Sequence, residues 1–193
     1  MALSDSIWWT RKAKIRSEKR LLSNAFQSQV LLLWYSFFSV AVSIYYLKSS
    51  QSDIGSVSWI VYSVLVLVIS GFINGLSFKE RANLIKECYE GLNSLYHQAN
   101  LGGANIKQVT HEYEQALNAC ENHTDQDYAI ALCQENWSST NPETELDRAP
   151  TNYHIYTFSM YFIKRYLLLG FFYLLPLLIM CVLNFIPFET SNS

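Results

Sequence analysis

Two long uncharged stretches near the start of the chain dominate its pattern of hydrophobic and polar positions. Residues 30–47 and 57–78 contain no Asp, Glu, Lys or Arg, and a short polar loop, residues 48–56, separates them. An α-helix rises about 1.5 Å per residue, so each stretch is about as long as the hydrocarbon core of a bilayer is thick. The pattern therefore predicts a transmembrane helical hairpin over residues 30–78.

A stretch of different character follows the second span, because its apolar residues recur every three or four positions. These positions are Leu84, Ile85, Cys88, Tyr89, Leu92, Leu95 and Tyr96. That spacing is typical of one face of an amphipathic α-helix. Since no proline interrupts the join, we expect residues 57–100 to form one continuous rod about 65 Å long, whose second half is a stalk outside the membrane.

Two adjacent glycines end the stalk, and helical spacing then resumes over residues 104–122. The apolar positions of this second helix are Ile106, Val109, Tyr113, Leu117 and Cys120. It should fold back on the stalk as an antiparallel helical hairpin. A further short helix is expected at about residues 125–135, because Thr124 and Asp127, three residues apart, match a capping box.

A third uncharged run, residues 166–186, predicts another membrane span near the C-terminus. Residues 153–165 before it are rich in aromatic residues and suit an interfacial segment, and residues 187–193 are a tail. The predicted fold class is an all-α membrane protein. Its transmembrane hairpin runs into a cytoplasmic helical module, residues 79–152, and a third, C-terminal transmembrane helix completes the chain.

The distribution of basic residues predicts which segments face the cytoplasm. Basic residues precede the first span, follow the second and precede the third, whereas the loop of residues 48–56 contains only Lys48 and the tail contains none. Cytoplasmic segments of membrane proteins carry an excess of Lys and Arg. All three flanks therefore agree on a cytoplasmic N-terminus and a cytoplasmic segment between the second and third spans.

The first 29 residues are basic and predicted to form an amphipathic helix. Trp8, Ile15, Leu22 and Phe26 share one helical face. Paired tryptophans beside basic residues suit a helix at the level of the lipid headgroups. A cytosolic helix packed on the stalk fits the same pattern, and the sequence does not separate the two alternatives.

Small polar residues repeat every seven positions along the first two spans, so that each set occupies one narrow helical face. The candidates for this polar stripe are Ser36, Ser43, Ser63, Ser70, Asn74 and Ser77. Gly71 and Gly75 form a G-x-x-x-G pattern, which lets two membrane helices approach closely. Two interpretations follow: the stripes serve helix packing, or several copies assemble and a stripe lines a water path. Neither stripe contains a charge, which argues against a proton relay or a selective ion transporter.

The sequence contains no motif of a known catalytic site, and we expect neither enzymatic activity nor a cofactor. Phosphate-binding loops, dinucleotide fingerprints, nucleophile elbows and zinc-protease helices are all absent from it. Cys120 and His123 are one helical turn apart, but the remaining His and Cys residues stand at no recognised metal-ligand spacing. A structural histidine is therefore favoured over a metal ligand. The weakly acidic net charge of −2 gives no support to nucleic-acid binding.

Three features of the chain together resemble the SLATT domains, small bacterial effector domains with two membrane helices and a cytoplasmic helical extension. The first two are the hairpin of residues 30–78 and its amphipathic continuation over residues 77–92. The third is the polar segment 121–128, which resembles an Asn-His-acidic motif of one SLATT subgroup. Its motif residues here are Asn122, His123, Asp125, Asp127 and Tyr128. The third span departs from the plain two-helix form but suits that subgroup.

The resemblance implies a pore-forming or membrane-disrupting effector of anti-phage defence in the bacterial inner membrane. Such an effector acts by abortive infection, as a homo-oligomer gated by a cytoplasmic signal or partner. The partner implied is a sensor encoded beside it, such as a nucleotide second-messenger synthase or a reverse transcriptase. The alternative is a non-conducting membrane anchor or scaffold whose helical module docks a cytoplasmic partner.

Overall fold

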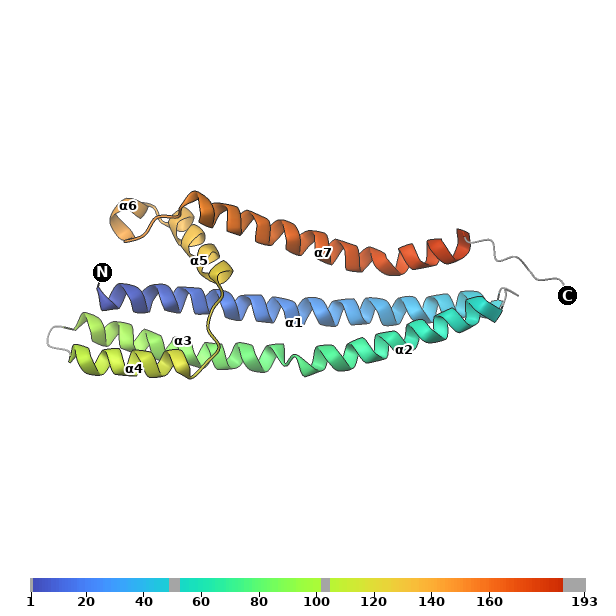
Figure 1. The fold of residues 1–193 in the computed structure, drawn as a ribbon, viewed down its shortest axis with the longest axis horizontal. Helices are drawn as coiled ribbons and strands as arrows, with labels where there is room; N and C mark the ends of the chain where they lie inside the picture. Colours follow the sequence, from blue (N-terminus) through green and yellow to red (C-terminus); the bar gives the residue numbers. More distant parts are fainter. Residues whose placement is uncertain (1, 49–52, 102–104, 186–193) are drawn as a thin grey trace. The chain divides into compact units, whose positions relative to one another are not determined.

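The computed structural model describes residues 2–48, 53–101 and 105–185, and every regular element in these ranges is an α-helix (Figure 1). The helices are α1 (Leu3–Lys48), α2 (Asp53–Gly75), α3 (Phe78–Asn100), α4 (Ile106–Asn118), α5 (Asp125–Ser138), α6 (Pro142–Glu145) and α7 (Asn152–Phe185). Among the described residues, three stretches are long and apolar enough to cross a membrane, namely Leu3–Ile44, Trp59–Asn100 and Asn152–Val182. The predicted all-α class with three spans is confirmed. The predicted tail and residues 49–52 of the loop after the first span lie outside the described residues, whereas residues 53–56, which were expected in that loop, belong to α2.

The chain divides into two compact units, each with its own contacts. Unit 1 comprises residues 1–25 and 77–164, and unit 2 comprises residues 26–76 and 165–193. The apolar spans predicted from the sequence fall almost entirely in unit 2, and the predicted cytoplasmic module falls in unit 1. Helices α1 and α7 each contribute residues to both units.

Two helix boundaries expected from the sequence are absent from the described chain. The amphipathic N-terminal segment and the first span form the single helix α1, and the interfacial segment and third span form the single helix α7. At both places the sequence changes from polar to apolar without a glycine or proline. A change in hydrophobicity alters what surrounds a helix, but it does not end the hydrogen-bonded backbone.

The continuous rod predicted for residues 57–100 is wrong in one respect, because the helix is interrupted between α2 and α3. Ser77 has a φ angle of 46° and a ψ angle of 39°, which is left-handed backbone. The Leu76 amide donates to the Ile73 carbonyl at 3.2 Å, a tightened last turn of α2. Gly71 and Gly75 weaken this end of the helix by about 1 kcal/mol each relative to alanine. The glycines that suggested helix packing therefore also lie where the helix stops.

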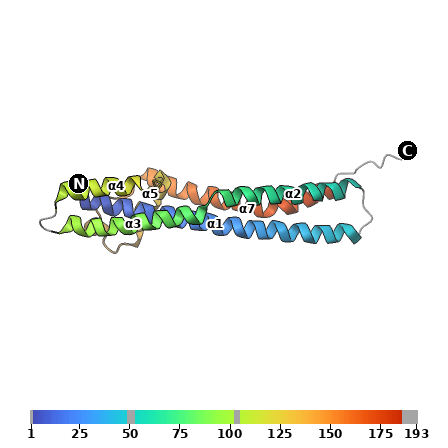
Figure 2. The same cartoon turned by 90° about the horizontal axis from the view of Figure 1, so that it is seen from below.

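Helices α3 and α4 of unit 1 form the antiparallel hairpin that the sequence predicted (Figure 1, Figure 2). Leu92 and Leu95 of α3 and Val109 of α4 are buried together, with Tyr113 packed against them. The Cys88 thiol donates to the Ala116 carbonyl at 3.1 Å. Two other predicted contact residues, Ile106 and Leu84, are exposed instead.

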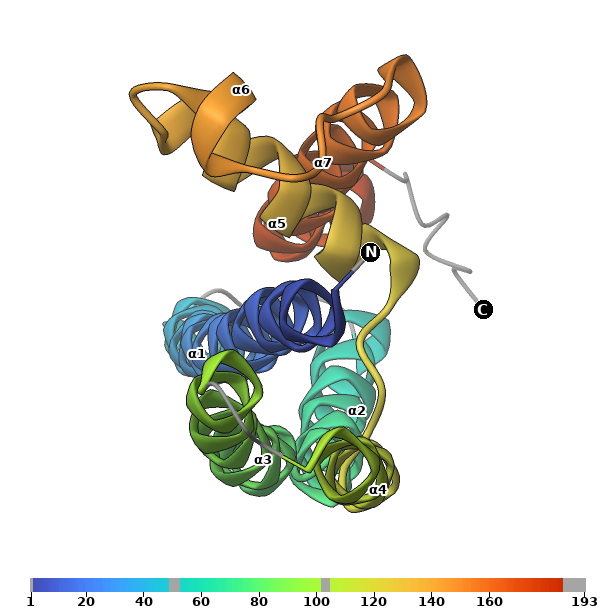
Figure 3. The same ribbon diagram turned by 90° about the vertical axis from the view of Figure 1, so that its left-hand side faces the viewer.

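The first part of α1 lies between this hairpin and α5, with α3 and α4 on one side and α5 on the other (Figure 3). Its buried face consists of Ile7, Trp9, Ala13, Lys14, Ser17 and Leu21. Ile7 joins the core of α3 and α4, while Leu21 packs against Ala82 and Ile85 of α3. This burial matches the alternative of a helix packed on the stalk. Of the face that the sequence pattern singled out, Leu22 and Phe26 are exposed, whereas Trp8 and Ile15 are half-buried.

Unit 2 is held together by a cluster of aromatic residues from α1 and α2, against which apolar residues of α7 pack. Its buried cluster consists of Phe38 and Val42 of α1 with Trp59 and Tyr62 of α2, and Ile179 and Met180 of α7 pack against it. The Tyr35 and Tyr62 rings stack with centroids 6.1 Å apart. By contrast, most of the large apolar side chains on the outward faces of these helices are exposed, as expected for helices that meet lipid.

Candidate functional site

The polar segment before α5 is built around the capping box that the sequence predicted. The Asp127 amide donates to the Thr124 hydroxyl at 3.2 Å, and the Thr124 amide donates to the Asp127 carboxylate at 3.0 Å. Together these bonds satisfy two backbone donors at the start of α5. The prediction of a helix starting at residue 125 is confirmed, and the helix extends three residues past the expected end, to Ser138.

Asp127 also binds α5 to α1 through an ion pair that local sequence does not reveal. The Arg20 Nε donates to Asp127 Oδ1 at 3.0 Å and its Nη2 donates to Oδ2 at 3.1 Å. The Asp127 side chain is 1% exposed and that of Arg20 is 19% exposed. Bidentate guanidinium–carboxylate pairs are among the strongest and most directional polar contacts in proteins. One carboxylate thus caps α5 and fixes it to α1.

Around this ion pair, aromatic and basic side chains from four segments meet. The Tyr128 ring lies 6.3 Å from the Trp9 ring and 6.3 Å from the His123 ring. Arg148 donates to the Tyr128 hydroxyl at 2.6 Å, and its guanidinium lies 5.8 Å from the Trp9 ring centroid. The Trp9 indole donates to Asp147 at 2.5 Å. We call His123, Asp127, Tyr128, Trp9, Arg20 and Arg148 the motif cluster.

The structure brings three of the five motif residues into this cluster and leaves two outside it. His123, Asp127 and Tyr128 are buried or half-buried, whereas Asn122 and Asp125 are exposed. The exposed pair flanks the start of α5, where it is open to solvent and to any partner.

Lys14 of α1 is fully buried next to the motif cluster. Its ammonium donates to the Cys120 sulfur at 2.9 Å and to the Glu121 carbonyl at 3.2 Å. Burial, followed by a hydrogen bond with Cys120, raises the pKa of the nearby Cys88 thiol to about 12, although Lys14 opposes this shift. Cys88 is therefore neutral at physiological pH and a poor nucleophile. No group of three or more His, Cys, Asp or Glu side chains that could hold a metal ion occurs within the described ranges.

Lowering the pH below about 6.5 is expected to destabilise unit 1 through His123. Burial and then the charge of Lys14 lower the pKa of His123, while Asp127 and Asp125 act in the opposite direction. A histidine with a lowered pKa stabilises the fold above its unfolded pKa of about 6.5, and that stabilisation is lost as the pH falls through the folded value. Thermal unfolding measured from pH 7.5 to 5 should show this decline. His123→Gln should flatten it, whereas replacing the exposed His97 by glutamine should not.

In unit 2, four serines of the first two spans line one groove between α1 and α2. Its volume is about 310 Å³, and its lining consists of Leu32, Ser36, Ser39, Ser63, Val66, Leu67 and Ser70. The hydroxyls of Ser39 and Ser63 are hydrogen-bonded at 2.9 Å across the two helices. We call this feature the serine groove. It joins three of the predicted stripe residues and adds Ser39, which the seven-residue repeat omits.

The remaining stripe and packing candidates lie elsewhere. Ser43 donates to the Ser39 carbonyl at 2.8 Å within α1, and Asn74 is exposed on α2. Ser77 belongs to unit 1, at the left-handed residue before α3. A methyl group added to Gly71 or Gly75 would meet no atom of the described chain within 4 Å, so this face of α2 is open.

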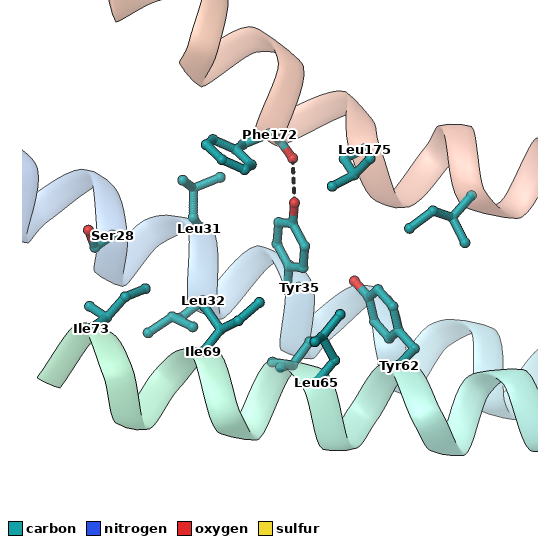
Figure 4. Close-up of a pocket in the computed structure, with 12 residues that line it drawn as sticks. Ser28, Leu31, Leu32, Tyr35, Tyr62, Leu65, Ile69, Ile73, Phe172 and Leu175 are labelled. Atoms are coloured by element: carbon teal, nitrogen blue, oxygen red, sulfur yellow. Dashed lines mark hydrogen bonds between the residues drawn. The ribbon is translucent and has the colours of Figure 1, made fainter. Parts of the chain in front are cut away.

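Pro176 leaves a backbone carbonyl of α7 without its helical hydrogen bond, and a side chain of α1 supplies the missing donor. Proline has no amide hydrogen, so the Phe172 carbonyl, four residues earlier, loses its helical partner. The Tyr35 hydroxyl donates to this carbonyl at 2.9 Å (Figure 4), and the Trp34 indole donates to the Tyr173 carbonyl at 3.1 Å. Within a bilayer a backbone carbonyl must find a donor from the protein. Two aromatic donors of α1 therefore fix the position of α7 in unit 2.

Replacing Tyr35 by phenylalanine is expected to lower the free energy of unfolding of unit 2 by about 1–2 kcal/mol, because the Phe172 carbonyl loses its hydrogen-bond donor. Unfolding of the full chain in detergent, followed by near-ultraviolet circular dichroism, measures the loss. The effect should shrink in a Pro176→Ala background, since alanine restores the amide donor within α7. An equal loss in both backgrounds would contradict this role for Tyr35.

A model of the SMODS and SLOG-associating 2TM effector domain family 5 matches residues 1–182. The chain belongs to the SLATT family. No curated protein and no solved structure matches it. The resemblance read from the hairpin, the stalk and the polar segment is thereby confirmed, and the match extends through the third apolar helix to residue 182.

Membership in the SLATT family makes the chain a membrane effector domain, and the family is not one of known enzymes. The family description specifies two transmembrane helices, whereas the described part of this SLATT chain has three helices able to span a membrane. The family's description associates it with SMODS and SLOG systems, which is consistent with a sensor partner.

Sequence reasoning missed several residues of both sites in this SLATT chain. The sequence pattern places Arg20 and Trp9 only in a basic amphipathic segment, although they contact residues 107 and 138 positions away. It places Tyr35 only in an apolar run. Pro176 was a usable signal for it, since a proline inside a predicted membrane helix leaves a carbonyl that a neighbouring helix must satisfy.

Proposed function

We propose that this SLATT protein is a pore-forming effector of anti-phage defence. Copies assemble in the bacterial inner membrane with the N-terminus in the cytoplasm, and on infection they open a path for ions that ends the growth of the host cell. The observation that carries the proposal is the serine groove, a hydroxyl-lined hollow of about 310 Å³ in the membrane unit. A path lined by uncharged hydroxyl groups can fill with water, and it contains no charged side chain that would bind an ion tightly.

Assembly through α2 is supported by the open glycine face. Gly71 and Gly75 meet no other helix within the described part of the chain, and Phe72 between them is 68% exposed. Small residues four positions apart let the backbones of two membrane helices approach closely. The same helix carries Ser63 and Ser70, so contact between copies along α2 brings serine grooves near one another.

Unit 1 is proposed to receive the signal and to act without catalysis. The contacts of its motif cluster are structural, because Asp127 caps α5 and pairs with Arg20, while Tyr128 contacts both Trp9 and Arg148. The exposed Asn122 and Asp125 beside it are free to meet a sensor encoded alongside. Because α1 and α7 run unbroken from unit 1 into unit 2, a rearrangement of unit 1 acts directly on two helices of the membrane unit.

Opening needs no chemical energy, since the membrane potential drives the ions. Each elementary charge that crosses releases about 2.3 kcal/mol per 100 mV. In the resting state a narrow constriction of Val and Leu beside serines stays shut by dewetting. Val66 and Leu67 line the serine groove and are suited to that role.

The test is a measurement of membrane potential after phage challenge. Cells express the protein with its neighbouring genes, and a potential-sensitive dye is followed through infection. We expect depolarisation before phage release, and no depolarisation when this gene alone is deleted. An unchanged potential in cells that are nevertheless protected would contradict pore formation.

A non-conducting membrane scaffold is the second candidate, and the hydrogen bond between Ser39 and Ser63 favours it. That bond joins two helices of the same chain, as a packing contact does. A scaffold would dock a partner through unit 1 without any current. Planar-bilayer recording of the purified full chain, with and without its partner, separates the two, since only a pore gives discrete conductance steps.

A further inference from the structure

A second hollow in unit 2 has chemistry opposite to that of the serine groove. It measures about 260 Å³ and lies among α1, α2 and α7 (Figure 4). Its lining is almost entirely hydrocarbon, from residues such as Leu31, Leu65, Ile69 and Leu175. From Tyr62 to Ile73 it follows α2 over twelve residues, a rise of about 16 Å. We call it the apolar pocket.

One polar atom in the apolar pocket lacks a partner. The Tyr62 hydroxyl is buried and makes no hydrogen bond to any described residue. The side chain is only 7% exposed, and its ring rises from α2 toward α7 with the hydroxyl outermost (Figure 4). The neighbouring Tyr35 differs, because its hydroxyl donates to the Phe172 carbonyl. A buried hydroxyl without an acceptor is unfavourable, so the apolar pocket offers a donor to whatever enters it.

The geometry points to an acyl chain of a bilayer phospholipid as the occupant, with its ester carbonyl accepting a hydrogen bond from Tyr62. An elongated apolar hollow about 16 Å long suits a hydrocarbon chain better than a compact ligand. Lipid is the apolar molecule that surrounds these helices in a membrane. The ester carbonyl is the polar group of that molecule that is covalently joined to the acyl chain, so it can reach Tyr62 while the chain fills the pocket.

The ring positions add a reason why the lipid would be held in one orientation. Tyr62 stacks on Tyr35 with an interplanar angle of 5° and meets Trp59 edge-on at 5.4 Å between centroids. These contacts fix the ring, so the hydroxyl is held in place before the ligand arrives. A pre-positioned donor favours binding because little side-chain freedom is lost.

The experiment compares two phospholipids with the same headgroup on the purified full chain in detergent. One is palmitoyl-oleoyl phosphatidylethanolamine, and the other is its dialkyl ether analogue, which lacks both ester carbonyls. Native mass spectrometry measures the lipid-bound fraction as the lipid concentration rises. We expect the wild-type chain to bind the diacyl lipid about fivefold more tightly, the difference expected for one hydrogen bond. Equal binding of the two lipids by the wild-type chain would overturn the proposal.

Two substitutions with matched controls locate the site. Tyr62→Phe should abolish the preference for the diacyl lipid, while Tyr166→Phe on α7 should keep it. Ile69→Trp should fill the apolar pocket and weaken binding of both lipids about tenfold or more. Val68→Trp adds the same bulk at the adjacent exposed position, which does not line the pocket, and should bind as the wild type does. If the two tryptophan variants bound lipid equally, the apolar pocket would not be the site.

Discussion

Replacing Asp127 by alanine is expected to lower the free energy of unfolding of unit 1 by about 3–5 kcal/mol. The change leaves the Arg20 guanidinium, which is 19% exposed, without its carboxylate. It also removes the acceptor for the Thr124 amide at the start of α5. Breaking one half of a buried ion pair is costly because the remaining charge stays away from water without compensation.

The loss is best measured at Cys133, a residue of α5 whose side chain is fully buried. Alkylation of the full chain in detergent, resolved by peptide mass spectrometry, reports how often α5 opens. In Asp127→Ala the labelling rate of Cys133 should rise about a hundredfold or more, since each 1.4 kcal/mol is a factor of ten. Cys181 is exposed and serves as the internal reference. An unchanged rate at Cys133 would mean that Asp127 does not hold α5 on α1.

Two controls separate the ion pair from the helix cap. Thr124→Ala removes the capping hydroxyl but leaves Asp127 paired with Arg20, and it should cost only about 1 kcal/mol. Arg20→Gln and Asp127→Asn, alone and together, form a double-mutant cycle. Because the two side chains are in direct contact, the cycle should give a coupling energy of about 1–3 kcal/mol. Additive effects would assign the stability to the cap alone.

Local sequence rules predicted the features whose partners are close in the chain. The capping box of Thr124 and Asp127 involves residues three positions apart, so the spacing alone identifies it. The three spans follow from length and lack of charge, and the hairpin of α3 and α4 follows from helical periodicity around two glycines. In each case the structure is decided by interactions between residues close in the chain, or by whether a segment is surrounded by lipid or by water.

The features that the sequence did not predict depend on contacts between distant segments. Lys14 is an example, because lysine is among the residue types least often buried, yet this one reaches Cys120 and the Glu121 carbonyl. Only the arrangement of α1 against the segment after α4 provides those acceptors. The break at Ser77 is similar, since about 1 kcal/mol of glycine propensity at Gly75 does not decide by itself whether a helix continues.

The serines that repeat every seven residues show what a sequence pattern predicts and what it does not. A seven-residue repeat places Ser63 and Ser70 on one face of α2, and the structure puts both in the serine groove. The repeat does not say what that face meets. Ser39 belongs to no predicted stripe, yet it provides the hydroxyl that pairs with Ser63. Register between two helices comes from packing of aromatic neighbours such as Phe38 and Trp59, which a repeat of small residues does not encode.

Replacing Ser63, Ser70 and Asn74 together by leucine is expected to abolish the toxicity of the protein during phage infection. Leucine removes the polar lining from α2, so a path along this helix stays dewetted when unit 1 changes arrangement. The single-channel conductance of the purified variant should fall at least tenfold, below the detection of a planar-bilayer recording. Growth and membrane potential after phage challenge measure the effect in cells.

A matched set of variants shows whether that loss reflects conduction or assembly. Threonine at positions 63 and 70 keeps a hydroxyl and should keep toxicity, while leucine at the exposed Val64 and Val68 changes the same helix away from Ser63 and Ser70 and should have no effect. Chemical cross-linking of each variant in membranes then reports assembly. Lost toxicity with intact cross-linked oligomers assigns the serines to the water path. Loss of both would favour the scaffold, because the hydrogen bond of Ser63 with Ser39 would then serve packing, and full toxicity in the leucine variant would exclude this face of α2 from the pore.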